Sequence, residues 1–168
     1  MWIRDALPKA FPNIRSVLFG YDTKLVERSS FQTIADLASF LAEMLKASDF
    51  ASPATKPLIF LAHSLGGIVL KEALDREPKI ARHVAGAVLF GVPSRGMETR
   101  ALMAMVSGQP NMGLVRDLTT GSGYLESLDD RFFDVARRGR MELFWAYETR
   151  ISPTVAVSMA RLMGCTTD

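Results

Sequence analysis

The sequence predicts an α/β fold, a three-layer αβα sandwich with a mostly parallel sheet, and three observations support this class. Short apolar runs typical of buried strands occur at residues 14–19, 58–62, 84–90 and 141–147. Segments with helical character separate these runs, and such alternation implies parallel strands joined by right-handed crossovers. A turn or a polar residue directly follows each run, which places candidate site residues at the carboxyl ends of the strands.

Length and composition suit one domain with its own core. The chain has 168 residues, of which 48% are hydrophobic and 23% charged, as in ordinary globular proteins. No repeat, low-complexity tract or linker divides it. Residues 1–168 are therefore predicted to form a single domain.

The first part of the chain is predicted to contain a short helix, a strand and a longer helix. The short helix spans residues 2–11 and ends among prolines. The strand at 14–19 stops at Gly20-Tyr21-Asp22. Ser29 to Gln32 matches an S-x-x-Q capping box at the start of the longer helix. The apolar stripe of this helix, which runs to about Lys46, consists of Phe31, Ile34, Leu37, Ala38, Leu41, Met44 and Leu45.

The second part is predicted to contain two further strands with a less regular region between them. A helix after the central strand ends near Pro78, and residues 84–90 form the next strand. The pattern then loosens, with four methionines among glycine and proline breakers: Met97, Met103, Met105 and Met112. Ser122 is the predicted cap of a second amphipathic helix, whose apolar stripe consists of Leu125, Leu128, Phe132 and Val135. The last strand is 141–147.

A serine in a glycine-assisted turn directly follows the central strand. The order is residues 58–62, then His63-Ser64-Leu65-Gly66-Gly67, then an apolar helix. This is the layout of a nucleophile elbow, in which a tight turn exposes the serine hydroxyl and only small residues fit beside it. Here those are Ala62, in place of the first glycine of G-x-S-x-G, and Gly66. Neither G-x-G-x-x-G nor G-K-[ST], the phosphate-binding alternatives, is present. An ordinary connection with a capping serine is the other interpretation.

Residues 62–74, together with Gly86-Ala-Val-Leu-Phe-Gly-Val-Pro-Ser-Arg-Gly96, resemble the lipase-like serine hydrolases of the α/β-hydrolase superfamily. Trp2–Pro8, Phe19–Asp22 and Tyr147–Thr149 are similar to one branch of that superfamily. This branch contains the serine-active-site mitochondrial lipase-like proteins, the GPI inositol-deacylase-like proteins, and fungal hydrolase domains associated with NLR-type or ankyrin-repeat receptors. The resemblance implies a partial α/β-hydrolase fold and a serine esterase or lipase that acts in lipid metabolism on carboxylic-ester or acyl-lipid bonds.

In this fold, lid segments are inserted after the strand at 84–90, so residues 97–140 are expected to be a lid-like helical insert. Methionine-rich surfaces adapt to flexible apolar ligands, which favours an acyl-binding lid as one interpretation. The other interpretation is a set of packing helices in which methionine fills gaps.

The resemblance also implies roles for the residues around the turn. Ser64 is the expected nucleophile, and the backbone N–H of Leu65 is one expected donor of the oxyanion hole. His63, Gly66 and Gly67 complete the elbow. The chain order of such a triad is serine, acid, histidine. Glu148, which closes the last strand, is the expected acid, with a solvated carboxylate as the other interpretation; Asp117, Asp129 and Asp130 are weaker alternatives.

The expected base is not evident. The chain has two histidines, His63 and His83, and both precede Glu148. In the family the catalytic histidine follows the final strand, and a second oxyanion donor lies on a loop after the third strand. The chain is therefore expected to be truncated at both ends relative to that family. Ser94 stands where the family's Pro-His-Arg-Gly segment usually has histidine.

Bulk properties limit the partners and the compartment. The net charge of +2 is too near neutral to suggest nucleic acid or an anionic membrane as an obligatory partner. The single cysteine, Cys165, leaves no internal disulfide and fits a reducing compartment. No apolar run reaches transmembrane length, and the start has no signal-peptide core. The expectation is a cytoplasmic protein, or one peripheral to the mitochondrion or endoplasmic reticulum.

Two classes of function remain open. The first is a hydrolase with a small-molecule or lipid ester substrate and with neither cofactor nor metal. The second is a catalytically inactive fragment, or an N-terminal signalling or effector module linked covalently to the other domains of a larger NLR- or ankyrin-type receptor.

Overall fold

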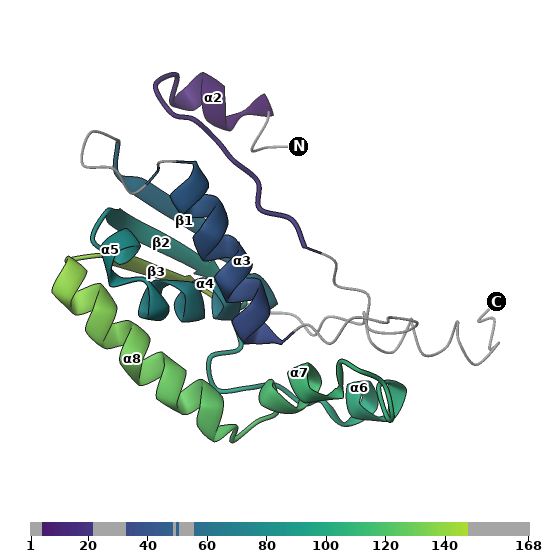
Figure 1. Cartoon of the computed structure of the whole chain (residues 1–168). Coiled ribbons are helices and arrows are strands. Elements are labelled where there is room, and N and C mark those ends of the chain that lie inside the picture. The colour runs from purple at the N-terminus through teal and green to yellow at the C-terminus, as the bar shows by residue number, and fades with distance from the viewer. Residues whose placement is uncertain (1–4, 22–32, 49, 51–55, 148–168) are drawn as a thin grey trace.

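The computed structural model describes residues 5–21, 33–48, 50 and 56–147. Their sheet has three strands, in the order β1-β2-β3: β1 (Leu58–His63), β2 (Val84–Phe90) and β3 (Glu142–Ala146). Both pairs are parallel, with Ala62 opposite Leu89 and Leu89 opposite Trp145. Parallel neighbours need long crossover connections. Helices supply them in Figure 1: α4 (Leu65–Arg76) and α5 (Pro78–Ala81), then α6 (Arg100–Met105), α7 (Met112–Asp117) and α8 (Gly123–Gly139).

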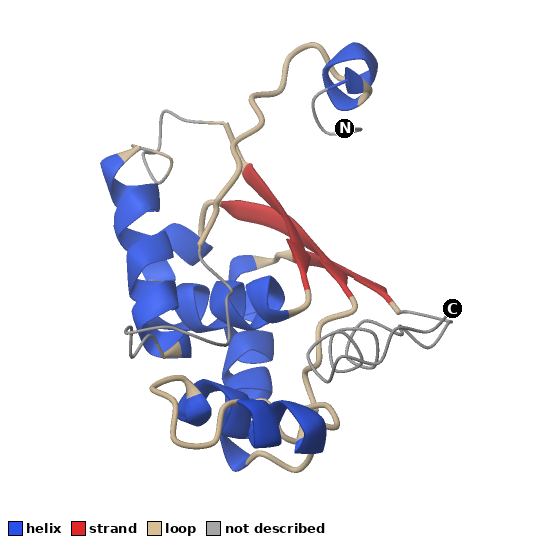
Figure 2. Ribbon diagram, turned by 90° about the vertical axis from the view of Figure 1, so that its right-hand side faces the viewer, coloured by secondary structure: helices blue, strands red, loops and turns tan. Residues whose placement is uncertain are grey.

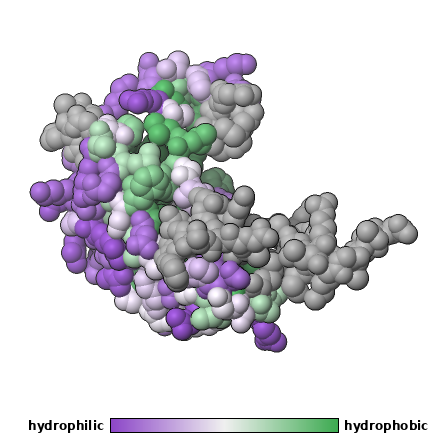
Figure 3. Space-filling view, turned by 45° about the vertical axis from the view of Figure 1, so that its right-hand side comes forward, coloured by the Kyte–Doolittle hydropathy of each residue, from purple (hydrophilic) through white to green (hydrophobic). Residues whose placement is uncertain are grey.

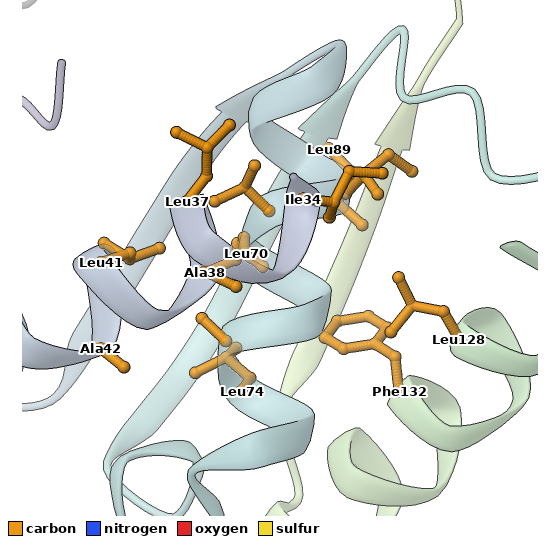
Figure 4. Close-up of a cluster of buried hydrophobic side chains, with 14 of the residues drawn as sticks. Ile34, Leu37, Ala38, Leu41, Ala42, Leu70, Leu74, Leu89, Leu128 and Phe132 are labelled. Carbon is orange, nitrogen blue, oxygen red and sulfur yellow. The ribbon is translucent and has the colours of Figure 1, made fainter. Parts of the chain in front are cut away.

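Helices α3 (Ile34–Ala47), α4 and α8 lie on one face of the sheet (Figures 1 and 2). Helix α4 packs between the other two, and every residue from Gly67 to Leu74 is buried. Leu70 and Leu74 of α4, Leu89 of β2 and Phe132 of α8 belong to the resulting core (Figure 4). The predicted α/β class and parallel sheet are confirmed.

The other face of the sheet carries apolar side chains that the described helices leave uncovered. Residues alternate between the two faces of a strand, and along β1 the side chains of Ile59 and Leu61 are 69% and 43% exposed. In β3, Phe144 is 62% exposed. Of the three predicted layers, the described residues therefore contain the sheet and one helical layer.

The strand predicted at residues 14–19 is wrong. These residues have no regular secondary structure, and Val17 and Leu18 are 53% and 65% exposed. A β-rich run becomes a strand only where a neighbouring strand satisfies its backbone groups, and in the described sheet β1 pairs only with β2. Phe19 instead packs its ring against Tyr21 and Phe40. Figure 3 shows an apolar area (green) in the upper half of the view, with polar residues (purple) to its left.

Helix α3 begins later than its predicted cap. Ser29, Phe31 and Gln32 lie outside the described residues, and the capping box is formed by Thr33 and Asp36. The Thr33 backbone N–H donates to Asp36 Oδ2 at 2.8 Å, and the Asp36 N–H donates to Thr33 Oγ1 at 3.1 Å. The predicted apolar stripe is confirmed by the buried members Ile34, Leu37, Ala38, Leu41 and Leu45.

The helices at the two ends of the described chain differ in how well their bounds were predicted. The helix expected at residues 2–11 is the short α2 (Leu7–Ala10), which buries no residue; residues 2–4 lie outside the described ranges. In contrast, α8 begins as predicted, since the Ser122 hydroxyl accepts from the N–H of Leu125. Its stripe is buried at Leu125, Leu128 and Phe132. Within the described residues, no helix combines the length and hydropathy needed to cross a bilayer.

Thr33→Ala is expected to lower the free energy of unfolding by about 1 kcal/mol, because the first turn of α3 loses its side-chain acceptor. Chemical denaturation followed by circular dichroism measures the change. Thr33→Ser keeps the accepting hydroxyl and serves as the matched control. If Thr33→Ala unfolds at the same denaturant concentration as the control, the cap contributes nothing.

The stability that the Thr33–Asp36 capping box contributes depends on pH. The backbone hydrogen bond from Thr33 lowers the pKa of Asp36 below its ordinary value of 3.8. A carboxyl pKa that is lower in the folded state adds stability above pH 3.8, and this contribution is lost as the pH falls through the folded value. In Asp36→Asn, the free energy of unfolding should therefore fall less than in the wild type as the pH is lowered through this range. Denaturant unfolding at a series of pH values measures the difference.

Candidate active site

Ser64 connects β1 to α4 without an intervening loop. β1 ends at His63 and α4 begins at Leu65, so the chain reverses at one residue. Ser64 has φ 50° and ψ −126°, a conformation that L residues rarely adopt and that costs roughly 1–3 kcal/mol. Such strain persists only where the surrounding structure determines it, and it is concentrated at functional sites.

The side chain of Ser64 is not used to cap the helix. Its hydroxyl makes no capping hydrogen bond to the first turn of α4, so the interpretation of Ser64 as an ordinary capping serine is wrong. The first N–H groups of a helix have no partner within the helix and carry a partial positive charge. The N–H of Leu65 opens α4 directly after Ser64, where a negatively charged oxygen would be stabilised.

The carboxyl ends of the three strands meet beside Ser64. The N–H of Ser64 donates to the carbonyl oxygen of Phe90, the last residue of β2, at 2.9 Å. The N–H of Gly91 in turn donates to the carbonyl oxygen of Ala146, the last residue of β3, at 2.8 Å. These two bonds continue the sheet past its strands and fix the backbone around the turn.

Gly67, rather than Gly66, is the position at which the structure requires glycine. A Cβ atom on Gly67 would lie 2.2 Å from Cγ2 of Val92, because the residues after β2 press against the first turn of α4. A Cβ atom on Gly66 would lie 3.5 Å from the Tyr21 hydroxyl oxygen, which is ordinary van der Waals contact. The sequence predicts the steric demand at Ala62 and Gly66, whereas in the structure it falls on Gly67 because of Val92.

His83 is not placed to activate Ser64. His83 precedes β2, and its carbonyl oxygen accepts from the N–H of Leu58 at the start of β1. The two ends of β1 are roughly 17 Å apart at 3.3 Å per residue, so His83 is at the opposite end of the sheet, as expected. His63 is exposed and alternates onto the same sheet face as Ile59 and Leu61.

The carboxylate predictions have different outcomes. Glu148, the predicted acid, lies outside the described residues. Asp129 is bound to the ammonium group of Lys71, and Asp130 is exposed on the same helix. Asp117 is half-buried, and this burial raises the pKa of its carboxyl group. Within the described ranges, no group of three or more His, Cys, Asp or Glu side chains could hold a metal ion.

Tyr21 lies near the turn, at one of the chain positions where the sequence predicts site residues, although the sequence predicts no role for it. It follows the β-rich run at 14–19, and its hydroxyl lies against Gly66 in the first turn of α4. Burial raises the pKa of the Tyr21 phenol above its ordinary value of 10.0; like an ordinary tyrosine, it is protonated near neutral pH and can donate a hydrogen bond. Its position at the end of an apolar run was the available signal.

The amino-acid sequence is similar to that of known proteins over most of its length. No family model matches the chain. Protein SERAC1 of Mus musculus is 27% identical over 176 residues, and Protein SERAC1 of Homo sapiens is 26% identical over 176 residues; each alignment covers 96% of this chain. The chain spans about a quarter of the length of these curated relatives, 26% in both cases.

Among solved structures, the mature lipase BlEst2 of Bacillus licheniformis superposes with a TM-score of 0.54 and 18% identity. The superposition covers 79% of this chain and 57% of that one. The likeness shows that this chain has a partial α/β-hydrolase fold, as predicted.

Gly67→Ala is expected to destabilise the protein by about 1–3 kcal/mol, because the added methyl group has no space beside Val92. Gly66→Ala is the matched control: its methyl group meets only ordinary contact, and alanine is the better helix former by up to about 1 kcal/mol. Denaturant unfolding measures both. Val92→Ala should partly rescue Gly67→Ala, and equal stabilities for the two glycine variants would contradict the steric argument.

Proposed function

We propose that this chain is the core of a serine hydrolase that cleaves carboxylic-ester or lipid acyl bonds through Ser64. The observation that carries the proposal is the strained backbone of Ser64 at a one-residue turn between a parallel strand and a buried helix. That arrangement is the nucleophile elbow of α/β-hydrolases. The lipase fold of the structural neighbour supports it, and we assign Ser64, His63, Leu65, Gly66 and Gly67 to the elbow.

In the proposed reaction, Ser64 Oγ attacks the carbonyl carbon of the ester while a base removes its proton. The negative oxygen that forms is stabilised by the N–H of Leu65, with the positive end of α4 behind it. Glu148 is the proposed acid that orients the base. The base itself is assigned to neither His63 nor His83, because of where these two side chains lie. One oxyanion donor is worth a factor of about 10²–10³ in turnover.

We assign the chain to the branch represented by Protein SERAC1, on the strength of alignments that span 96% of its length. The proposed substrate is a small-molecule or lipid ester. The proposed location is the cytoplasm, or the periphery of the mitochondrion or endoplasmic reticulum.

A second candidate is a non-catalytic signalling or effector module of a larger receptor, of the kind that fungi attach to NLR-type or ankyrin-repeat domains. The observation that favours it is the placement of the two histidines, since a serine without a base is a weak nucleophile. In this case the hydrolase fold would act as a binding module, and Ser64 would be retained from an ancestral enzyme without a catalytic role.

A fluorophosphonate probe is expected to modify Ser64 and no other serine to a comparable extent. The measurement is mass spectrometry of the peptide that contains residue 64, on this chain and on any longer product that includes it. Ser64→Ala should abolish the modification, whereas Ser39→Ala, an exposed serine of α3, should leave it unchanged. Equal labelling of several serines, or no labelling of a longer product, would contradict the proposed hydrolase.

Exogenous imidazole separates the two candidates. If Ser64 is a competent nucleophile that lacks only its base, imidazole at high concentration should accelerate its labelling by about tenfold or more, which is less than the 10²–10⁴ that a positioned base supplies. Ser64→Ala provides the background rate. If imidazole does not accelerate the labelling of the wild-type chain, the non-catalytic module is favoured.

A further inference from the structure

Lys71 is a fully buried cation in the middle of α4, 1% exposed. Its ammonium group is bound to the carboxylate of Asp129 on α8 and donates to Ser94 Oγ at 2.6 Å. It also lies 4.6 Å from the ring centroid of Trp145 in β3 and 5.4 Å from that of Phe132 in α8. One side chain therefore contacts three elements that approach α4 from different parts of the sequence.

Stability alone does not account for a lysine at this position. A buried ion pair has a large desolvation cost, and replacing it with apolar side chains of similar volume is often neutral or stabilising. Burial lowers the pKa of the Lys71 ammonium group, although Asp129 acts in the opposite direction. What apolar side chains cannot reproduce is the directional attachment of Ser94 and Asp129 to one point on α4.

Ser94 precedes α6 and α7 in the chain, and Asp129 follows them. We call residues 91–122 the β2–α8 segment; Ser94 is near its start, and Asp129 follows its end in α8. The two ends of the segment are also bonded to each other. The N–H of Met97 donates to Leu118 O at 2.9 Å, and the N–H of Thr120 donates to Met97 O at 3.1 Å.

Further contacts close the base of this segment. The hydroxyls of Thr99 and Thr119 are 2.7 Å apart. Gly96 has φ 82°, and a Cβ atom there would lie 2.4 Å from the carbonyl oxygen of Thr119. The segment is thus a closed loop whose base is a fixed unit. Its buried residues Val106, Val115 and Leu118 join the same core as α4, and its first residues make a row of contacts with that helix.

That row follows one face of α4. Val92 packs on Gly67, and Ser94 is bound to Lys71. Gly67 and Lys71 are four residues apart, so their side-chain positions are adjacent on the helix surface. With the bond from Ser64 to Phe90 O, residues 90–94 are attached to α4 at three successive points. Lys71 makes the last of these attachments.

We infer that Lys71 is a positioning residue that fixes the β2–α8 segment onto α4, and so sets the place of that segment relative to Ser64. It acts through Ser94 and Asp129, and its own side chain is buried. Its effect on the order of the segment is independent of catalysis. Its effect on hydrolysis rests on the proposed function.

Hydrogen exchange measured by mass spectrometry tests the inference. In the double variant Lys71→Met/Asp129→Leu, the buried pair is replaced by apolar side chains, so the fold should be retained. The hydrogen-bonded amides of Ser94 and Met97 should then exchange at least about tenfold faster than in the wild type, because an attachment to a charged group is lost. Amides within β2 should be unchanged.

Two further variants make the result decisive. Ser94→Ala keeps the Lys71–Asp129 pair and so tests the attachment in a protein with an intact core. It should accelerate the same two amides. Lys79→Met removes an exposed lysine of α5 and should change neither. Wild-type exchange at Ser94 and Met97 in Ser94→Ala or in the double variant would overturn the inference.

Labelling of Ser64 by the fluorophosphonate probe, in the same variants, connects the segment to catalysis. Slower labelling in Ser94→Ala and in the double variant, with unchanged labelling in Lys79→Met, is expected. If Ser64 is not labelled in any protein, the proposed hydrolase fails, while the exchange result still decides the role of Lys71.

Discussion

The strained backbone of Ser64 depends on the burial of the helix that follows it. A residue with φ 50° returns to a relaxed conformation unless its neighbours hold it. On one side Ser64 is bonded to Phe90 and thus to the sheet. On the other side it leads into α4, which is buried from Gly67 to Leu74 between α3, α8 and the strands. Neither end of the turn can move without disrupting the core.

The same burial explains the polar network around α4. A helix covered on all sides has no solvent-facing position for Lys71 and Glu72, so both must find partners inside the protein. Glu72 accepts from Arg76 Nε at 2.6 Å and from the Tyr124 hydroxyl at 3.0 Å. Burial, together with the charge of Glu72, raises the pKa of Tyr124. Because Asp129 and Tyr124 are both in α8, the polar groups of α4 also determine where α8 lies.

These constraints converge at the carboxyl end of the sheet. In open parallel sheets this end is where ligands bind, since the strands stop there and the connections diverge. Here Ser64, the residues after β2 and the end of β3 are joined by consecutive backbone hydrogen bonds. The first turn of α4 opens into the same region, with the hydroxyl of Tyr21 beside it. The region therefore combines a strained serine, helix N–H groups and a neutral phenol.

The sequence by itself determined the features that depend on local pattern: the α/β class, the strands β2 and β3, the stripe of α3, the Ser122 cap of α8, and the turn at Ser64. Apolar periodicity and turn chemistry are properties of neighbouring residues, so they can be read without the fold. Only the tertiary structure decided that residues 14–19 form no strand, because a strand requires a partner from elsewhere in the chain. It also decided that Val92 imposes glycine at position 67, and that Lys71 is buried against Ser94 and Asp129. These contacts join residues 23 to 58 positions apart, and no local pattern encodes such distances.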